Sequence, residues 1–271
     1  MDAFDVLVIG EANVDLIVQS ADPLPVYGRE KLVDDLHLTI GSSSAIFACG
    51  VARLGLRTAL ASIVGADAFG DWMMRALQDR GVATELIRRL PGRKTGATVS
   101  LSTAHDRALL TYPGTIADLE PGMIDPDALR RARHVHTASY FLQPRLAPGL
   151  PELLARARAA GATVSVDTGW DSADRWDAGL WQVLAQADVF LPNEIEAQRI
   201  TGVQGAEEAL AALAARVPTV VIKQGARGAM ARRGREIVRV PAMPVHVVDT
   251  TGAGDSFDAG FVYGYLRGWG L

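Results

Sequence analysis

A segment near the C-terminus combines small residues with a carboxylate in a spacing that could bind an anion and move a proton. Residues 250–255 are Thr-Thr-Gly-Ala-Gly-Asp, and the apolar residues Phe257, Phe261 and Tyr265 then recur at helical spacing. Small residues at a helix N-terminus leave backbone N–H groups uncrowded, and such groups bind anions. Asp255 falls in the first helical turn, where the helix dipole favours its ionised form by about 0.3–1 kcal/mol. An anion cradle beside a carboxylate base suits phosphoryl transfer to a hydroxyl.

The same residues could also have a purely structural role or belong to a different catalytic motif. A tight turn with an Asp near a helix start is common without any catalytic role. A Walker loop is excluded, because no Gly-Lys-Ser/Thr follows a GxxxxG spacing. Residues 254–257, Gly-Asp-Ser-Phe, have the look of an esterase serine motif, but no histidine follows Ser256 and the five histidines show no partnering pattern.

Short apolar runs alternate with helical patterns, and this alternation predicts the elements that position the segment. The predicted buried strands are residues 4–9, 59–64, 134–138, 163–167, 189–191 and 219–222, and helical stripes cover residues 72–77, 150–157 and 206–217. Alternating strands and helices favour an α/β fold with a mainly parallel sheet covered on both faces. Residues 16–40 and 94–113 instead alternate with period two, which predicts half-exposed antiparallel strands in one small projecting sheet.

Composition excludes several classes of protein. The 271 residues include 27 Lys plus Arg against 31 Asp plus Glu, a net charge of −4 that argues against binding to nucleic acid. The single Cys49 excludes a disulfide framework and a cysteine-based zinc cluster. We see neither a targeting segment nor an apolar run long enough for a membrane helix, so we expect a cytoplasmic protein with no membrane partner.

Most of the chain, taken in order, resembles the PfkB-type or ribokinase-like sugar kinases. The segments that carry the resemblance are residues 8–15 (first strand and Asn-x-Asp turn), 41–55 and 64–70 (N-terminal signature), 193–196 (Asn-x-x-Glu), 223–228 (glycine loop) and 249–261 (C-terminal signature). The resemblance implies a ribokinase-like three-layer α/β/α sandwich over residues 1–271. Residues 16–40 and 94–113 would form its β-lid, and the lid often pairs with a second lid in a homodimer.

The resemblance also implies roles for single residues. Asp255 would deprotonate a sugar hydroxyl, while the backbone N–H groups of Gly252, Ala253 and Gly254 would hold the transferred phosphoryl group. The residues implied on the substrate side are Asn13, Asp15, Gly41 and Ser42, and those on the nucleotide side are Asn193, Lys223, Gly225 and Gly228.

Two cation sites follow from the same resemblance. Glu196, one helical turn from Asn193, would position hydrated Mg²⁺, and a loop with Asp249 and Thr251 holds a monovalent cation in the family, usually K⁺. The expected cofactors are therefore ATP, Mg²⁺ and K⁺. Structural roles stay open for single residues: Asp15 could simply end a strand, and Asn193 could cap a helix.

The sequence departs from the family pattern in two places. Ser42 replaces the second glycine of the N-terminal signature, and Ile46 replaces an asparagine that faces the sugar. Because Ile46 cannot hydrogen-bond a hydroxyl, we expect a substrate other than ribose. The sequence also ends at Leu271, where family members continue, so we expect their C-terminal helices to be missing and the chain to be truncated or the nucleotide pocket open.

The leading hypothesis is an ATP-dependent kinase that phosphorylates a hydroxyl of a small sugar or sugar acid. One alternative is a nucleoside kinase of the same fold, with Tyr112, Tyr140 or Phe141 stacking on the base. Another is a non-catalytic sugar-binding or regulatory relative. An NAD-dependent oxidoreductase is the weakest, because the first strand leads into Gly-Glu-Ala-Asn at residues 10–13 rather than GxGxxG.

Overall fold

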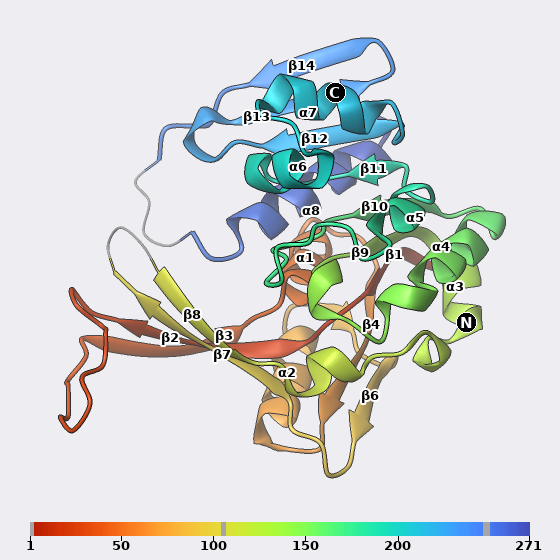
Figure 1. Ribbon diagram of the computed structural model, residues 1–271. Helices are drawn as coiled ribbons and strands as arrows, with labels where there is room; N and C mark the ends of the chain where they lie inside the picture. The colour runs from red at the N-terminus through yellow and green to blue at the C-terminus, as the bar shows by residue number, and fades with distance from the viewer. Residues whose placement is uncertain (1–2, 104–106, 246–249) are drawn as a thin grey trace.

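Alternate residues of β1 (Phe4–Ile9) pack into two different cores, which explains the layered fold. Val6 and Val8 belong to one core, whereas Leu7 and Ile9 belong to the other. Successive side chains of a strand point to opposite faces, so a buried strand apolar at every position needs helices on both sides. The computed structural model describes residues 3–103, 107–245 and 250–271 and has these three layers (Figure 1).

Ten strands form the central sheet in the described part of the chain, in the order β14-β13-β12-β11-β10-β9-β1-β4-β5 with β6 paired to β4. The strands after β1 are β4 (Thr58–Gly65), β5 (Val82–Ala83), β6 (Ile87–Leu90), β9 (Ala132–Thr137), β10 (Thr163–Val166), β11 (Val189–Phe190), β12 (Thr219–Lys223), β13 (Ala229–Arg233) and β14 (Glu236–Val240). The sheet is parallel except for the β12–β13–β14 meander. The six predicted strands match β1, β4 and β9 to β12, and the predicted mainly parallel α/β fold is confirmed.

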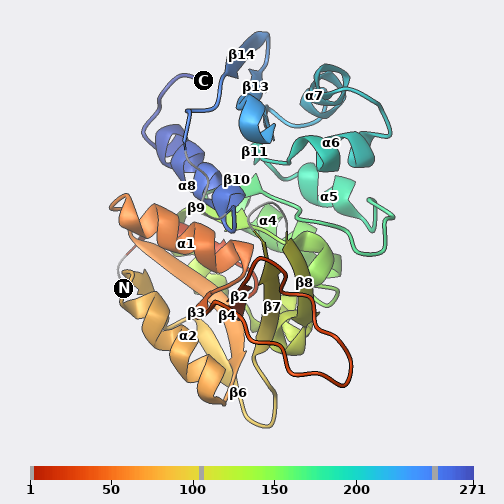
Figure 2. The ribbon, with the colours of Figure 1, turned by 90° about the vertical axis from the view of Figure 1, so that its left-hand side faces the viewer.

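Helices cover both faces of this sheet (Figures 1 and 2). On one face lie α1 (Ser43–Arg53), α2 (Ala68–Gln78) and α8 (Ala253–Leu266). On the other face lie α3 (Pro126–Arg131), α4 (Leu150–Ala159), α5 (Leu180–Leu184), α6 (Glu194–Thr201) and α7 (Ala206–Ala214). The three helical stripes predicted from the sequence fall on α2, α4 and α7.

A second sheet projects from the body, with the strand order β3-β2-β7-β8 (Figure 1). Its strands are β2 (Asn13–Gln19), β3 (Asp35–Ile40), β7 (Gly96–Ser102) and β8 (Arg107–Tyr112). The pairs β2–β3 and β7–β8 are antiparallel, as the alternation predicts, but β2 and β7 are parallel. The reason is that β2 and β7 follow β1 and β6, two strands of the parallel central sheet, and leave it in the same direction.

Candidate active site

Two helices begin side by side at the carboxyl ends of the central strands. Ile46 of α1 lies against Gly252, where a Cβ would be 3.0 Å from the Ile46 Cγ2 atom. One to two turns further on, a Cβ on Gly50 would lie 2.7 Å from the Ala259 Cβ of α8. The small residues let α1 and α8 approach closely, and both N-termini therefore direct their positive ends toward one region.

Asp255 lies in the first turn of α8, between these two helix starts. It accepts a hydrogen bond from Ser43, the first residue of α1. Burial, followed by the negative charge of Asp167, raises the pKa of Asp255 to about 6, against the opposing effects of Lys223 and Ser43. The helix dipole favours ionisation of Asp255, but desolvation has the larger and opposite effect on its pKa. Asp255 is nevertheless mostly ionised at neutral pH and matches the requirement for a general base.

The backbone amides at the start of α8 are only partly free. Gly252 precedes the helix with φ 70° and provides no capping side chain. The Ala253 N–H donates to the Thr250 carbonyl at 3.2 Å, so this member of the expected anion cradle is already in use. The amides of Gly254 and Asp255 have no backbone acceptor within the described residues. An anion at this helix start would therefore meet Gly254 and Asp255 rather than Ala253.

The predicted substrate residues converge where the small sheet meets the body. Asn13 and Asp15 lie within β2, not in a turn after the first strand. Asn13 Nδ2 donates to Asp15 Oδ1 at 3.2 Å. A Cβ on Gly41 would collide with Asp15 Oδ1 and would lie 2.6 Å from Asn13 Nδ2. Glycine at position 41 therefore lets the carboxylate and the amide lie directly against the backbone that leads into α1.

Ser42 adopts φ 74°, a conformation that normally requires the glycine found there in the family pattern. Its hydroxyl caps α1 by accepting from the Ala45 N–H at 3.0 Å and donates to the Glu11 carbonyl at 2.6 Å. These two hydrogen bonds offset a backbone strain of about 1–3 kcal/mol. The Ser42 side chain is thus committed to the protein and orients the start of α1.

A cavity of about 530 Å³ lies between the edge strand β3 and α1. Ile46, Cys49 and Thr251 line it together with residues 37–40. Ile46 thus provides apolar surface where the family pattern has an asparagine. Thr251, expected near a monovalent cation, lies at this cavity, whereas its expected companion Asp249 lies outside the described residues.

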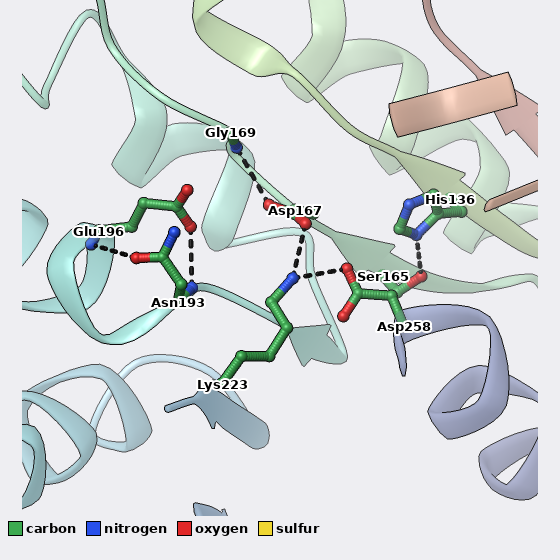
Figure 3. A network of polar contacts seen from close by, with 8 residues as sticks. All are labelled: His136, Ser165, Asp167, Gly169, Asn193, Glu196, Lys223 and Asp258. Atoms are coloured by element: carbon green, nitrogen blue, oxygen red, sulfur yellow. Dashed lines mark hydrogen bonds and ion pairs between the residues drawn. The ribbon is translucent and has the colours of Figure 1, made fainter. Parts of the chain in front are cut away.

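On the nucleotide side, Asn193 and Glu196 form a capping box at the start of α6 (Figure 3). The Asn193 side chain accepts from the Glu196 N–H at 2.9 Å, and Glu196 Oε2 accepts from the Asn193 N–H at 2.8 Å. Burial and the nearby charge of Asp167 raise the pKa of Glu196 to about 7. A buried carboxylate short of positive charge fits a cation held nearby through water. Among the described residues no three His, Cys, Asp or Glu side chains gather as a metal cluster.

The glycine loop after β12 forms a short turn, closed by a 2.8 Å hydrogen bond from the Gln224 N–H to the Gly228 carbonyl. Gly225 has φ 58°, and no atom lies within 4 Å of its Cβ position, so this glycine faces open space. Gly228 has φ 94°, and a Cβ there would collide with the Val240 carbonyl. The packing of β14 therefore requires glycine at position 228, while Gly225 borders an accessible face.

Lys223 lies in a buried cluster that the sequence did not predict (Figure 3). Its Nζ is 2.8 Å from Asp167 Oδ2 and 2.8 Å from Asp258 Oδ2. Asp167 directly follows β10, and Asp258 lies in α8. The positions of Asp167 and Lys223 at the carboxyl ends of predicted strands were the available signal, because such ends meet at one edge of a parallel sheet. The structure therefore brings Asp255, Gly254, Glu196 and Lys223 into one region, with Asp15 and Gly41 on the side of the small sheet.

Comparison with known proteins agrees with this geometry. The chain matches the model of pfkB family carbohydrate kinases over residues 3–271. An uncharacterized sugar kinase from Archaeoglobus fulgidus is 32% identical over 221 residues, which cover 81% of this chain and 87% of that protein. Adenosine kinase from Sinorhizobium meliloti has a TM-score of 0.88 and 26% identity, over 99% of this chain and 89% of that one. Arabidopsis thaliana ribokinase, complexed with ribose and ATP, has a TM-score of 0.85 and 25% identity, over 99% and 88%.

The fold and these relatives define an enzyme of the carbohydrate-kinase class, a phosphotransferase with a ribokinase-like α/β fold. The chain belongs to the pfkB family. Within the part of the chain that the structure describes, each helix is too short or too polar to cross a bilayer.

Proposed function

We propose that the protein phosphorylates a hydroxyl of a small sugar or sugar acid with ATP. The observation that carries this proposal is the position of Asp255, whose carboxylate lies beside the open amide of Gly254 at the meeting point of two helix N-termini. A base and an anion site in the same helical turn serve the two demands of phosphoryl transfer to an alcohol.

In the proposed reaction Asp255 accepts the proton of the acceptor hydroxyl. The alcohol oxygen then forms its bond to the γ-phosphorus, the bond from that phosphorus to the β,γ-bridging oxygen breaks, and ADP leaves. The amides of Gly254 and Asp255, with the positive end of the α8 dipole, stabilise the oxygens of the transferred group. Asp15 and Asn13 orient the acceptor through its other hydroxyls, and Ile46 adds an apolar contact that favours an acceptor different from ribose.

The nucleotide side of the site is proposed from the loops after β11 and β12. Gly225 borders the open face on which the phosphates and ribose of ATP would lie, and Asn193 with Glu196 would face the phosphates. Mg²⁺, when bound near Glu196, supplies charge neutralisation for the phosphate oxygens. K⁺ near Thr251 stays a prediction.

We further propose that the small sheet is a lid over the acceptor. Asp15 pairs with Thr39 and with Thr98 across the sheet, so these residues share the face directed toward the site. The opposite face exposes Leu36 and Leu38 of β3 and Leu110 of β8. Closure of the polar face excludes water from the transferred group, and the exposed apolar face would pair with the lid of a second subunit.

The aromatic residues that suggested a nucleoside acceptor do not form a stacking platform. Tyr140 is buried, donates its hydroxyl to the Ala178 carbonyl at 2.6 Å, and packs edge-on against Phe141. Phe141 in turn packs against Trp176. Tyr112 pairs with Ala97 and therefore lies on the face of the small sheet opposite to Asp15. These positions favour a sugar or sugar acid over a nucleoside.

The decisive experiment measures ADP release with Mg²⁺ and K⁺ in the presence of a panel of neutral sugars, sugar acids and nucleosides. We expect turnover with a sugar or sugar acid above the rate of ATP hydrolysis without acceptor. Turnover with nucleosides alone would contradict the proposed acceptor class. Acceptor binding in calorimetry without ADP release from any acceptor would contradict the proposed activity itself.

A further inference from the structure

The ammonium of Lys223 joins three elements at the edge of the proposed site. Lys223 ends β12, Asp167 follows β10, and Asp258 belongs to α8 (Figure 3). The two hydrogen-bonded ion pairs are both 2.8 Å long, and the exposed fractions of the side chains are 13% for Lys223, 8% for Asp167 and 1% for Asp258. Through this one side chain, α8 is fastened to the carboxyl ends of two strands of the central sheet.

The ion pairs of Lys223 restrain the helical turn that carries the proposed base, Asp255. Asp258 follows Asp255 by three residues and Gly254 by four, so all three lie on neighbouring positions of one face of α8. A Cβ on Gly254 would lie 3.5 Å from the Lys223 Nζ atom. The ammonium therefore lies directly beside the first turn of the helix as well as pairing with its second turn.

The first turn of α8 has no capping side chain of its own. The N-termini of α1, α2 and α6 are held by the side chains of Ser42, Asp67 and Asn193, which accept from backbone N–H groups. The start of α8 has only Gly252, in the left-handed conformation. Open amides suit an anion, but they deprive the turn of the local hydrogen bonds that normally fix a helix start. Contacts further along the helix therefore add to the hydrogen bond between Ser43 and Asp255 in setting the position of this turn.

We propose that Lys223 is a positioning residue for phosphoryl transfer: held by Asp167 and Asp258, it fixes the first turn of α8 so that the Gly254 amide and the Asp255 carboxylate address the same reacting group. This inference rests on the proposed kinase activity. The family resemblance implies that Lys223 contacts the nucleotide directly. The inference gives it a different role, which is to fix the start of α8.

The charge of the cluster is compatible with an anion site above it. Two ionised carboxylates and one ammonium would leave a net negative charge buried beneath the phosphoryl group, which is costly. Burial raises the pKa of Asp258 well above its usual range. Burial also opposes ionisation of Asp167, but the charge of Lys223 and a hydrogen bond from Asp258 outweigh it and lower the pKa of Asp167 to about 2. These opposite shifts favour the protonated form of Asp258 over that of Asp167, which reduces the excess negative charge of the cluster.

The test compares Lys223→Met with the control variant Arg239→Met. Arg239 lies in β14, and its guanidinium forms an exposed ion pair with Glu207 at 2.7 Å. In Lys223→Met we expect kcat to fall by about 10–100-fold, because misplacement of catalytic groups by about 1 Å has effects of this size. The KM values for ATP and acceptor should change less than about threefold, since Lys223 touches neither. Hydrogen exchange of the Ser256 amide, which donates to the Gly252 carbonyl at 2.9 Å, should accelerate about tenfold. Arg239→Met should leave all four quantities unchanged.

Asp258 provides a second pair of variants if Lys223→Met does not fold. Asp258→Asn keeps a neutral partner for Lys223 and Asp167, so kcat should stay within about threefold of the wild type. Asp258→Ala removes the link and should reproduce the loss of kcat and the faster exchange. A lower melting temperature with unchanged kcat in Asp258→Ala would overturn the proposal, because it would show a purely structural role. A higher KM for ATP with unchanged kcat in Lys223→Met would also overturn it, in favour of nucleotide contact.

The exchange measurement separates this inference from the activity on which it rests. If the wild type turns over no acceptor, the proposed function fails, while exchange of the Ser256 amide still tests whether Lys223 fixes the helix start. If the wild type is active and exchange in Lys223→Met matches the wild type, the kinase assignment stands and the positioning role is rejected.

Discussion

Two buried polar clusters lie in the same layer, between the central sheet and the helices α1 and α8, and only one of them carries charge. In the neutral cluster, Ser165 of β10 hydrogen-bonds both His134 and His136 of β9 at 2.7 Å. The ring of His136 also stacks on Phe47 of α1, with 3.6 Å between the ring centroids. Burial lowers the pKa of both histidines to about 3, so both rings are neutral. This cluster completes its hydrogen bonds within the sheet.

The charged cluster begins two residues further along the same chain segment. Asp167 follows Ser165 on the same side of β10 and pairs with Lys223, which pairs in turn with Asp258 (Figure 3). Here the strands end, and the start of α8 supplies open amides and the carboxyl group of Asp255. Burial raises the pKa of Asp255 to about 6 instead of abolishing its charge.

The difference between the clusters is one of position in the sheet. Both are desolvated, and desolvation disfavours charge in both. In the middle of the strands no helix end compensates, so neutral groups such as His134 stabilise the fold. At the carboxyl ends the α8 N-terminus and Lys223 stabilise charge, so the same burial yields a base with a pKa close to the operating pH. We therefore expect changes in the charged cluster to affect turnover and changes in the neutral cluster to affect stability.

The largest expected effect is that of Asp255→Asn. Without the base, kcat should fall by about 10²–10⁴-fold, the range associated with general-base catalysis. The free energy of unfolding should rise on the order of 2 kcal/mol above pH 6, because the wild type carries an ionised, desolvated carboxylate there. A raised carboxyl pKa stabilises the folded state only at low pH, so this gain should vanish below about pH 4. Steady-state kinetics and urea unfolding check both parts.

A result that breaks the comparison would be an Asp255→Asn variant with wild-type turnover. That outcome would show that another residue is the base and that the charged cluster is not needed for turnover. Unchanged stability with lost turnover would instead leave the base in place and reject only the desolvation argument for Asp255.

The sequence predicted the neutral surroundings of the site better than its charged interior. Buried strands were predictable because runs such as residues 4–9 are apolar at nearly every position. In contrast, β13 has half-buried Arg residues, β14 has exposed Glu and Arg residues, and neither shows such a pattern. The start of α8 was predictable because its glycines and Asp255 are contiguous in the sequence. The link between Asp167, Lys223 and Asp258 was not, because the three residues lie 35 to 91 positions apart and only the strand order brings them together.

Backbone conformation and solvation were equally hidden in the sequence. The sequence shows Ser42 in place of a glycine of the family pattern, but not that this serine adopts φ 74° and is held by hydrogen bonds to Ala45 and Glu11. The effect of the dipole on Asp255 was predictable because the dipole is a local property of the helix. Burial depends on everything packed above it, so its larger and opposite effect could be read only from the structure.

The neutral cluster is tested by the pH dependence of stability in His134→Gln. The unfolded chain binds a proton on this histidine below about pH 6.5, whereas the folded chain does not until about pH 3, so the wild type loses stability as the pH falls between these values. At pH 5 the loss is ~2 kcal/mol for this one ring, which is about a 30-fold change in the unfolding equilibrium. Glutamine can still bond Thr163 and Ser165 but does not titrate.

Urea unfolding at pH 8 and pH 5 measures this difference. Between these pH values the free energy of unfolding of the wild type should fall by ~2 kcal/mol more than that of His134→Gln. His136→Gln is the matched variant and should behave in the same way, while kcat at pH 8 should stay within about twofold in both variants. Equal pH dependence in the wild type and both variants would show that the rings are not held neutral. A large loss of kcat in either variant would show that the neutral cluster also affects turnover, contrary to the difference proposed between the clusters.

The smallest effect concerns the pH profile of the wild type. Catalysis requires the ionised form of Asp255, whose pKa burial and the Asp167 charge raise to about 6, so kcat/KM should be level above pH 7 and fall about tenfold per unit below pH 6. The residual activity of Asp255→Asn is the control, because it retains every other titrating group of enzyme and nucleotide but lacks this carboxyl. Its profile should therefore lose the inflection near pH 6. If the inflection persists in Asp255→Asn, another group sets it, and the claim that burial tunes Asp255 as the base is wrong even though the residue remains essential.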